Sequence, residues 1–304
     1  MGNTIAPRIE NAEKTGVLQV SGLKLKKVPE QVKHLRNLRS LDLSNNKIEN
    51  IDPWISVLKN LKVLNVENNK LKYFPAELYL LTKLESLNGN SNFLINFITP
   101  GAIVNLNELS CLRTVNLSHN CLTEFPVELC LKSIPINVID LSNNQISIIP
   151  NAIASLQAIE INLNSNKISI ISNGIAQCER LKVLRLEHNC LRLENFPTEL
   201  LTNSQVSLIC VDGNSFNMKD FYNLPGYSKV SYSRHYYLFN YSFHAHLLPY
   251  RVTSTFSLRY LTFVVYGTFY SNEEKSCLEN IQKRRQFFLV KIKHNYYRYH
   301  TLSD

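Results

Sequence analysis

Apolar residues recur at fixed spacings along most of the first 220 residues, and nearly every group of them ends with an asparagine. In one such unit the apolar positions are Leu38, Leu41, Leu43 and Ile48, with Asn46 between the last two. The pattern starts again at residues 61, 84, 112, 136, 158, 181 and 206, and a unit starting at residue 15 keeps the phase without the asparagine. A period of roughly 23 residues is typical of solenoid proteins, whose single units are too small to bury their apolar side chains alone.

Each unit begins with an apolar–polar alternation, which predicts a short β-strand with one buried face. We expect parallel strands near 40–44, 63–67, 86–90, 114–118, 138–142, 160–164, 183–187 and 208–212. Prolines such as Pro29 and Pro75 follow the strands and fix the start of a return segment with helically spaced apolar residues. The sequence therefore predicts an α/β fold, a right-handed repeat solenoid with a curved parallel sheet on its concave side and short helices or turns on its convex side.

An asparagine stands three residues after the second inward-facing position of eight predicted strands. Its side-chain amide both donates and accepts hydrogen bonds, so it can satisfy turn backbone groups of neighbouring units. We expect a structural ladder of Asn46, Asn69, Asn92, Asn120, Asn144, Asn166, Asn189 and Asn214.

The unit that starts at Leu84 departs from the pattern. It has Gly89 where a buried strand residue is expected, and the next unit starts 28 residues later. A binding loop around Thr99–Asn107 is one interpretation. We favour a tolerated surface insertion over a weakly packed repeat.

The spacing L-x-x-L-x-L-x-x-N-x-L, as in Leu61, Leu64, Val66, Asn69 and Leu71, resembles the leucine-rich repeat family over residues 15–220. The resemblance implies a protein-interaction module without enzymatic activity, and it specifies no partner. Relatives include cytoplasmic repeat proteins that bind Ras-type GTPases and scaffold signalling complexes. No nucleotide-binding, zinc-protease or serine-hydrolase motif occurs in the chain, so we expect no catalytic residue, no metal and no cofactor.

Charge divides the chain into two regions. Residues 1–228 carry 22 basic and 20 acidic side chains, whereas residues 229–304 carry 11 and 4. We therefore expect an N-terminal lipidation segment and cap at 1–14, about nine repeats over 15–228, and a basic, aromatic-rich tail at 229–304 that is not an independent domain. Nucleic-acid binding through this tail is an alternative function.

Polar side chains of the predicted strands should point out of the sheet on its concave face. The candidate partner-binding residues are Asp42, Asn65, Glu67, Asn88, Asn116, Asp140, Glu160, Asn162, Arg185, Glu187 and Asp212. Six of them are acids and one is a base, so the face should attract a folded protein with a basic surface and repel nucleic acid.

The chain opens with Met1-Gly2-Asn3, and Gly2 is a candidate for N-myristoylation, although Ala6 stands where Ser or Thr is preferred. The seven cysteines form no CxxC pair, which favours reduced thiols in the cytosol. We expect a cytoplasmic adaptor or scaffold, partly at the membrane through reversible contact of a myristoyl group. A regulatory subunit or cofactor of a signalling enzyme is the alternative.

Overall fold

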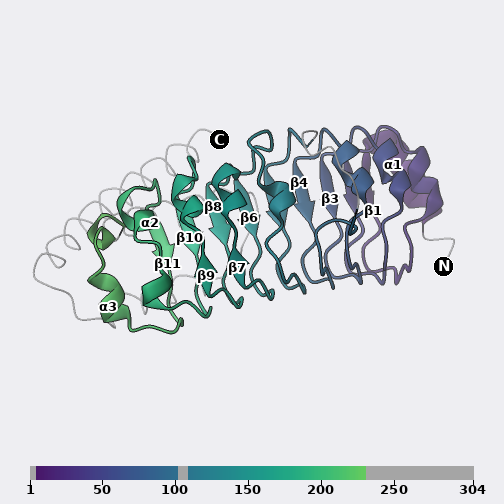
Figure 1. Ribbon diagram of the computed structural model, residues 1–304. Helices are drawn as coiled ribbons and strands as arrows, with labels where there is room; N and C mark the ends of the chain where they lie inside the picture. The colour runs from purple at the N-terminus through teal and green to yellow at the C-terminus, as the bar shows by residue number, and fades with distance from the viewer. Residues whose placement is uncertain (1–4, 102–108, 231–304) are drawn as a thin grey trace, which may run out of the picture. The chain divides into compact units, whose positions relative to one another are not determined.

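The computed structural model describes residues 5–101 and 109–230, and these form a row of short parallel strands (Figure 1). Gly2, the tail from residue 231 and most of the predicted insertion lie outside the described residues. Nine strands of the described part make one sheet, in the order β1-β2-β3-β4-β5-β6-β8-β10-β11. Their bounds are β1 Val17–Gln19, β2 Ser40–Asp42, β3 Val63–Asn65, β4 Ser86–Asn88, β5 Thr114–Asn116, β6 Val138–Asp140, β8 Glu160–Asn162, β10 Val183–Arg185 and β11 Leu208–Cys210.

All strand pairs of this sheet are parallel and keep one register. Leu41 lies beside Leu18 on one side and Leu64 on the other, and the middle residue of every strand is buried against one continuous core. The predicted solenoid class is confirmed. The strands start where the sequence predicts and end two residues earlier.

The early strand ends follow from a turn that recurs in almost every unit. Asn45, Asn68, His119 and His188 are among the residues in the left-handed region, with φ between 53° and 56°. A side chain in this region costs roughly 1 kcal/mol or more, which Asn tolerates best. The chain therefore leaves the strand direction just before each ladder asparagine.

The return segments are 3-10 helices where the sequence suggested helices or turns. Their bounds are η2 Glu30–His34, η3 Pro53–Val57, η4 Ala76–Leu80, η6 Val127–Leu129, η7 Asn151–Ser155, η8 Asn173–Gln177 and η9 Leu193–Asn195. The residue before η2, Pro29, is extended with φ −60°, so the proline directs the chain into the return segment. Two-residue strands β7 Ile148–Ile149 and β9 Ile170–Ile171 pair in a second small sheet.

Helices occupy both ends of the described array. At the first end, α1 (Ala6–Thr15) stops at Gly16, whose φ of 70° suits the left-handed end of a helix. The carbonyl of Gly16 then accepts the backbone N–H groups of Arg39 and Ser40, which joins the helix to β2. At the other end lie α2 (Glu199–Thr202) and α3 (Met218–Tyr222), where the ring of Phe221 packs edge-on against that of Phe196.

The repeat at Leu84 is closely packed, so the prediction of a weakly packed unit is wrong. A Cβ atom on Gly89 would lie 3.0 Å from the ring of Phe74 and 3.2 Å from a methyl group of Leu117. Phe74 therefore fills the space that a strand side chain fills in the other units. Phe97 and Tyr79, both buried, complete this aromatic cluster through edge-to-face contacts.

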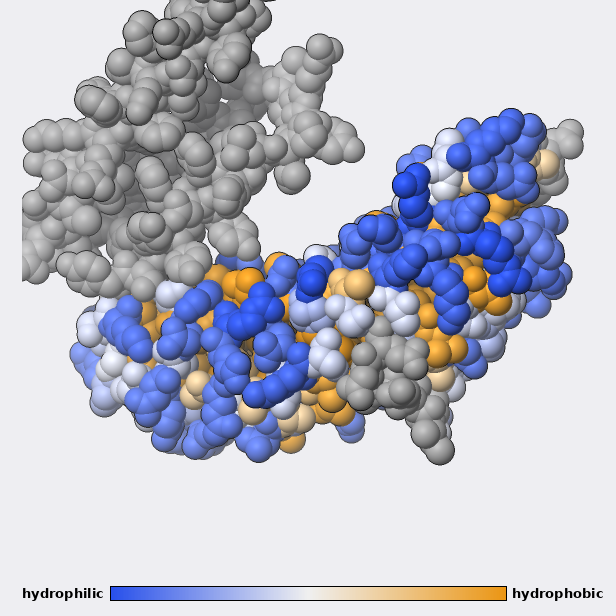
Figure 2. All heavy atoms as spheres, turned by 90° about the horizontal axis from the view of Figure 1, so that it is seen from above, coloured by the Kyte–Doolittle hydropathy of each residue, from blue (hydrophilic) through white to orange (hydrophobic). Residues whose placement is uncertain are grey.

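Hydrophilic residues dominate the visible face of the α1 end of the array in Figure 2. Among the described residues, no helix has the length and apolar composition to cross a membrane.

Candidate functional site

The ladder asparagines connect each repeat to the one before it. Asn144 donates from Nδ2 to the carbonyls of Leu117, Leu141 and Ser142 at 3.0, 3.0 and 3.2 Å. Its Oδ1 accepts the backbone N–H of Leu122 at 3.0 Å. The same set of acceptors and donors recurs, with small variations, at the other ladder positions, and seven of the eight side chains are buried while that of Asn214 is half-buried. These amides are structural, and a ligand on the concave face would not reach them.

On β2, β3 and β4, the candidate binding residues form a chain of hydrogen bonds across the strands. Asp42 Oδ1 accepts the backbone N–H of Ser44 at 2.9 Å and the amide of Asn65 at 3.2 Å. Asn88 donates its amide to Glu67 Oε2 at 3.1 Å. Both carboxylates are half-buried and held in fixed orientations on the concave face.

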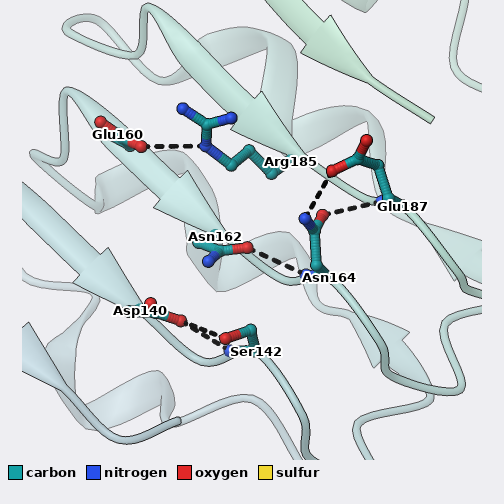
Figure 3. A network of polar contacts seen from close by, with 7 residues as sticks. All are labelled: Asp140, Ser142, Glu160, Asn162, Asn164, Arg185 and Glu187. Atoms are coloured by element: carbon teal, nitrogen blue, oxygen red, sulfur yellow. Dashed lines mark hydrogen bonds and ion pairs between the residues drawn. The ribbon is translucent and has the colours of Figure 1, made fainter. Parts of the chain in front are cut away.

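A second group of polar contacts covers β6, β8 and β10 (Figure 3). Asp140 Oδ1 accepts the backbone N–H and the hydroxyl of Ser142 at 2.9 and 2.7 Å. Asn164 donates its amide to Glu187 Oε2 at 2.6 Å and accepts the backbone N–H of Glu187 at 2.8 Å. Asn162 orients Asn164 by accepting its backbone N–H at 3.1 Å.

Glu160 differs from the other ten candidate binding residues, which are half-buried. It is 9% exposed, and its Oε1 lies 3.0 Å from Nε of Arg185 on the next strand. Burial lowers the pKa of Arg185, but the hydrogen bond and charge of Glu160 outweigh this and raise it. Glu160 and Arg185 therefore neutralise each other. The prediction that Glu160 is an acid available to a partner is wrong.

The remaining candidates extend the polar surface without joining a single cluster. Asn116 on β5 accepts the backbone N–H of Ser118 at 3.0 Å, and Asp212 follows β11. Asp42 and Asp212 are separated by seven strand spacings, which amounts to roughly 34 Å. This distance suits a large, extended partner better than a small molecule.

Comparisons with known proteins identify the repeats. A family model for two leucine-rich repeats matches residues 36–78, and a model for the single leucine-rich repeat matches residues 111–131 and 136–156. The array is a leucine-rich repeat solenoid. Among solved structures, it is similar to a leucine-rich repeat protein of Leptospira interrogans, with a TM-score of 0.53 and 28% identity over 69% of this chain. The match covers 58% of the Leptospira protein.

Two further solved structures show the same fold at lower identity. Internalin C2 of Listeria monocytogenes matches 68% of this chain and 92% of its own, with a TM-score of 0.54 and 18% identity. The leucine-rich repeat domain of APL1B matches 73% of this chain and 65% of its own, with a TM-score of 0.53 and 19% identity. Leucine-rich repeat arrays generally mediate protein–protein interaction.

The residues that directly precede the leucine-rich repeat strands form a row that is rich in bases, and the sequence-based prediction missed it. The backbone N–H of Lys62 donates to the carbonyl of Arg39, and the same bond repeats from unit to unit. This row consists of Gly16, Arg39, Lys62, Glu85, Arg113, Asn137, Ile159, Lys182 and Ser207. Four members of this row are bases and one is an acid. The concave acids other than Glu160 lie toward the opposite ends of the strands. Reading the residue before each predicted strand would have revealed this row.

Two thiols lie within the convex layer of the leucine-rich repeats. Burial raises the pKa of Cys130 and of Cys178 to about 12, so both remain protonated at neutral pH and are poor nucleophiles. In residues 5–101 and 109–230, no three His, Cys, Asp or Glu side chains are grouped in a way that would hold a metal ion.

Thiol alkylation should follow this burial. We expect iodoacetamide at pH 8 to modify the exposed Cys190 in the folded protein, and Cys130 and Cys178 only after unfolding in urea. Peptide mass spectrometry of the native and urea-treated protein measures the difference. Modification of Cys178 as fast as Cys190 under native conditions would contradict the buried placement.

Proposed function

We propose that this protein is a non-enzymatic adaptor or scaffold that holds a folded protein partner with a basic surface on its concave face. The observation that carries the proposal is the set of carboxylates fixed across the strands, at Asp42, Glu67, Asp140 and Glu187. Their hydrogen bonds are made before a partner arrives, so less side-chain entropy is lost on binding.

Charge on this face favours a basic partner over an acidic one. The pairing of Glu160 with Arg185 removes one acid and the single base, and leaves an acidic surface along the strand ends. Such a surface increases the rate of association with basic proteins and loses that effect as salt screens it.

Reversal of two concave charges should therefore weaken partner binding. For a partner identified by proximity labelling and then purified, we expect Asp140→Lys with Glu187→Lys to lower affinity about tenfold or more, mainly through slower association at low salt. Glu49→Lys with Glu124→Lys is the matched control, because both acids are exposed and lie beyond the strands. Surface-plasmon resonance measures both rates.

The same binding measurement can also reject the concave face as the partner-binding site. If the reversed and control variants bind equally, and deletion of residues 229–304 releases the partner, the tail is the binding region. That result would favour the alternative of a regulator that acts through its C-terminal segment.

We further propose that residues 1–228 resemble leucine-rich repeat-containing protein 57, on the basis of the opening Met1-Gly2-Asn3 and the flanking segments NAEKTGVLQV and LPGYSK. The resemblance supports a role in small-GTPase-type signalling and a cytoplasmic location with partial membrane association.

N-myristoylation of Gly2 is the part of this proposal with the most direct test. One myristoyl chain gives only reversible membrane binding, with a partition constant of roughly 10⁴ M⁻¹. We expect protein co-expressed with the acyltransferase to gain the mass of one myristoyl group, and Gly2→Ala to lose both that mass and its share of membrane-bound protein. An unmodified Gly2 amine in the intact-mass spectrum would end the claim.

A further inference from the structure

A groove between helix α1 and the starts of strands β2–β4 is lined by basic side chains. Lys14, Arg39, Lys62 and Lys83 line it together with one acid, Glu13, and its volume is about 420 Å³. It lies at the strand-start edge, whereas the carboxylates assigned to the adaptor function lie toward the strand ends. We propose that this groove binds an acidic segment of a protein chain, as a second docking site distinct from the acidic concave face.

Hydrogen bonds already hold the bases around the groove. Arg39 donates to the carbonyl of Thr15 at the end of α1, at 3.0 Å. Lys83 donates to Oδ1 of Asn60 at 2.7 Å, so its cation is held by a neutral group. Lys62 pairs with Glu85 at 2.7 Å, and both side chains are about half exposed. Lys14 pairs with Glu10 at 3.2 Å, so among the described residues Arg39 and Lys83 are the two groove bases that form no ion pair.

Arg39 and Lys62 lie next to each other along the edge of the groove. Arg39 and Lys62 occupy equivalent positions of neighbouring strands, which lie roughly 4.8 Å apart. Like charges at directly neighbouring positions of a sheet repel each other, and Glu85 on the next strand offsets only the Lys62 side of this repulsion. An anion bound between them converts this repulsion into attraction, and this differential interaction would contribute to binding.

Shape and surrounding charge favour an acidic peptide segment over a membrane or nucleic acid. The volume lies within the range of small-ligand sites, which suits a few residues of an extended chain and excludes a duplex. A flat anionic bilayer that approached this edge would also meet α1, whose Glu10 and Glu13 offset Arg8 and Lys14. Single carboxylate side chains, by contrast, can enter the groove and reach the bases individually.

The test uses the full-length protein and a fluorescein-labelled hexaglutamate peptide at low ionic strength, with binding followed by anisotropy. We expect Arg39→Glu with Lys83→Glu to weaken binding about tenfold or more. Lys70→Glu with Lys72→Glu is the control, because it changes the net charge equally at exposed positions after the strands. Comparison of these two variants cancels any contribution from the basic tail. Lys83→Gln, with thermal unfolding of every variant, separates a binding loss from misfolding.

Each outcome decides the proposal. A selective loss in the groove variants, with Asp140→Lys and Glu187→Lys leaving hexaglutamate binding intact, supports a second site and separates it from the proposed adaptor function. Equal losses in the groove and control variants would show general charge attraction and overturn it. Loss of binding to phosphatidylserine vesicles or duplex DNA, with hexaglutamate binding unchanged, would assign the groove to that other ligand and also overturn it.

Discussion

Replacing Leu117 with aspartate should unfold the repeat array. Leu117 is fully buried, and one of its methyl groups lies against the position of Gly89 in the preceding unit. The substitution places a carboxylate between two units with no base in the repeat pattern to pair with it, and we expect a loss of more than about 4 kcal/mol of unfolding free energy. Urea denaturation followed by circular dichroism measures the loss.

Asn116→Asp is the control for this prediction because it introduces the same side chain one residue earlier. Asn116 is half-buried on the concave face, and aspartate occurs naturally at the equivalent position in β6, as Asp140. We expect a change within about 1 kcal/mol. A Leu117→Asp protein with the stability of this control would contradict the assignment of Leu117 to the core.

Asn144→Ala should have the second largest effect. The change leaves the buried Leu122 N–H without its acceptor, whereas the carbonyls of Leu117 and Leu141 keep the side-chain amides of Asn120 and Asn166. An unsatisfied buried N–H group costs roughly 1–3 kcal/mol, and the amide bonds to the three carbonyls are lost as well, so we expect a loss of about 2–3 kcal/mol. Thermal and urea unfolding measure the loss directly.

The neighbouring Asn143 provides the matched control for the ladder. It is exposed, lies in the left-handed conformation and corresponds to Ser165 in the next unit. Asn143→Ser should therefore change stability by less than about 1 kcal/mol. If the two variants lose equal stability, the ladder amide of Asn144 does not bridge the units as described.

Features that repeat with the period could be predicted from the sequence because they depend on local spacing. The strand starts, the parallel order and the buried apolar positions belong to this class. The burial of Glu160 could not be predicted, because it depends on Arg185, which lies 25 residues away and adjacent only in the folded sheet. Similarly, the ring of Phe74, which belongs to the preceding unit, fills the space beside Gly89. A prediction made from the Leu84 unit alone therefore interprets the glycine as a packing defect.

The ladder asparagines also set the order in which the repeats complete their hydrogen bonds during synthesis. The turn N–H of Leu122 is satisfied by Asn144, which lies 22 residues later in the chain, and the same dependence recurs from Leu25 on Asn46 to Leu191 on Asn214. During synthesis, the turn of a unit that has left the ribosome therefore stays without its side-chain acceptor until the next unit has emerged. At roughly 5–20 residues per second the delay is about one to five seconds per unit. The growing chain should thus always end in one incompletely bonded repeat, and this moving end is where a chaperone would find exposed apolar surface.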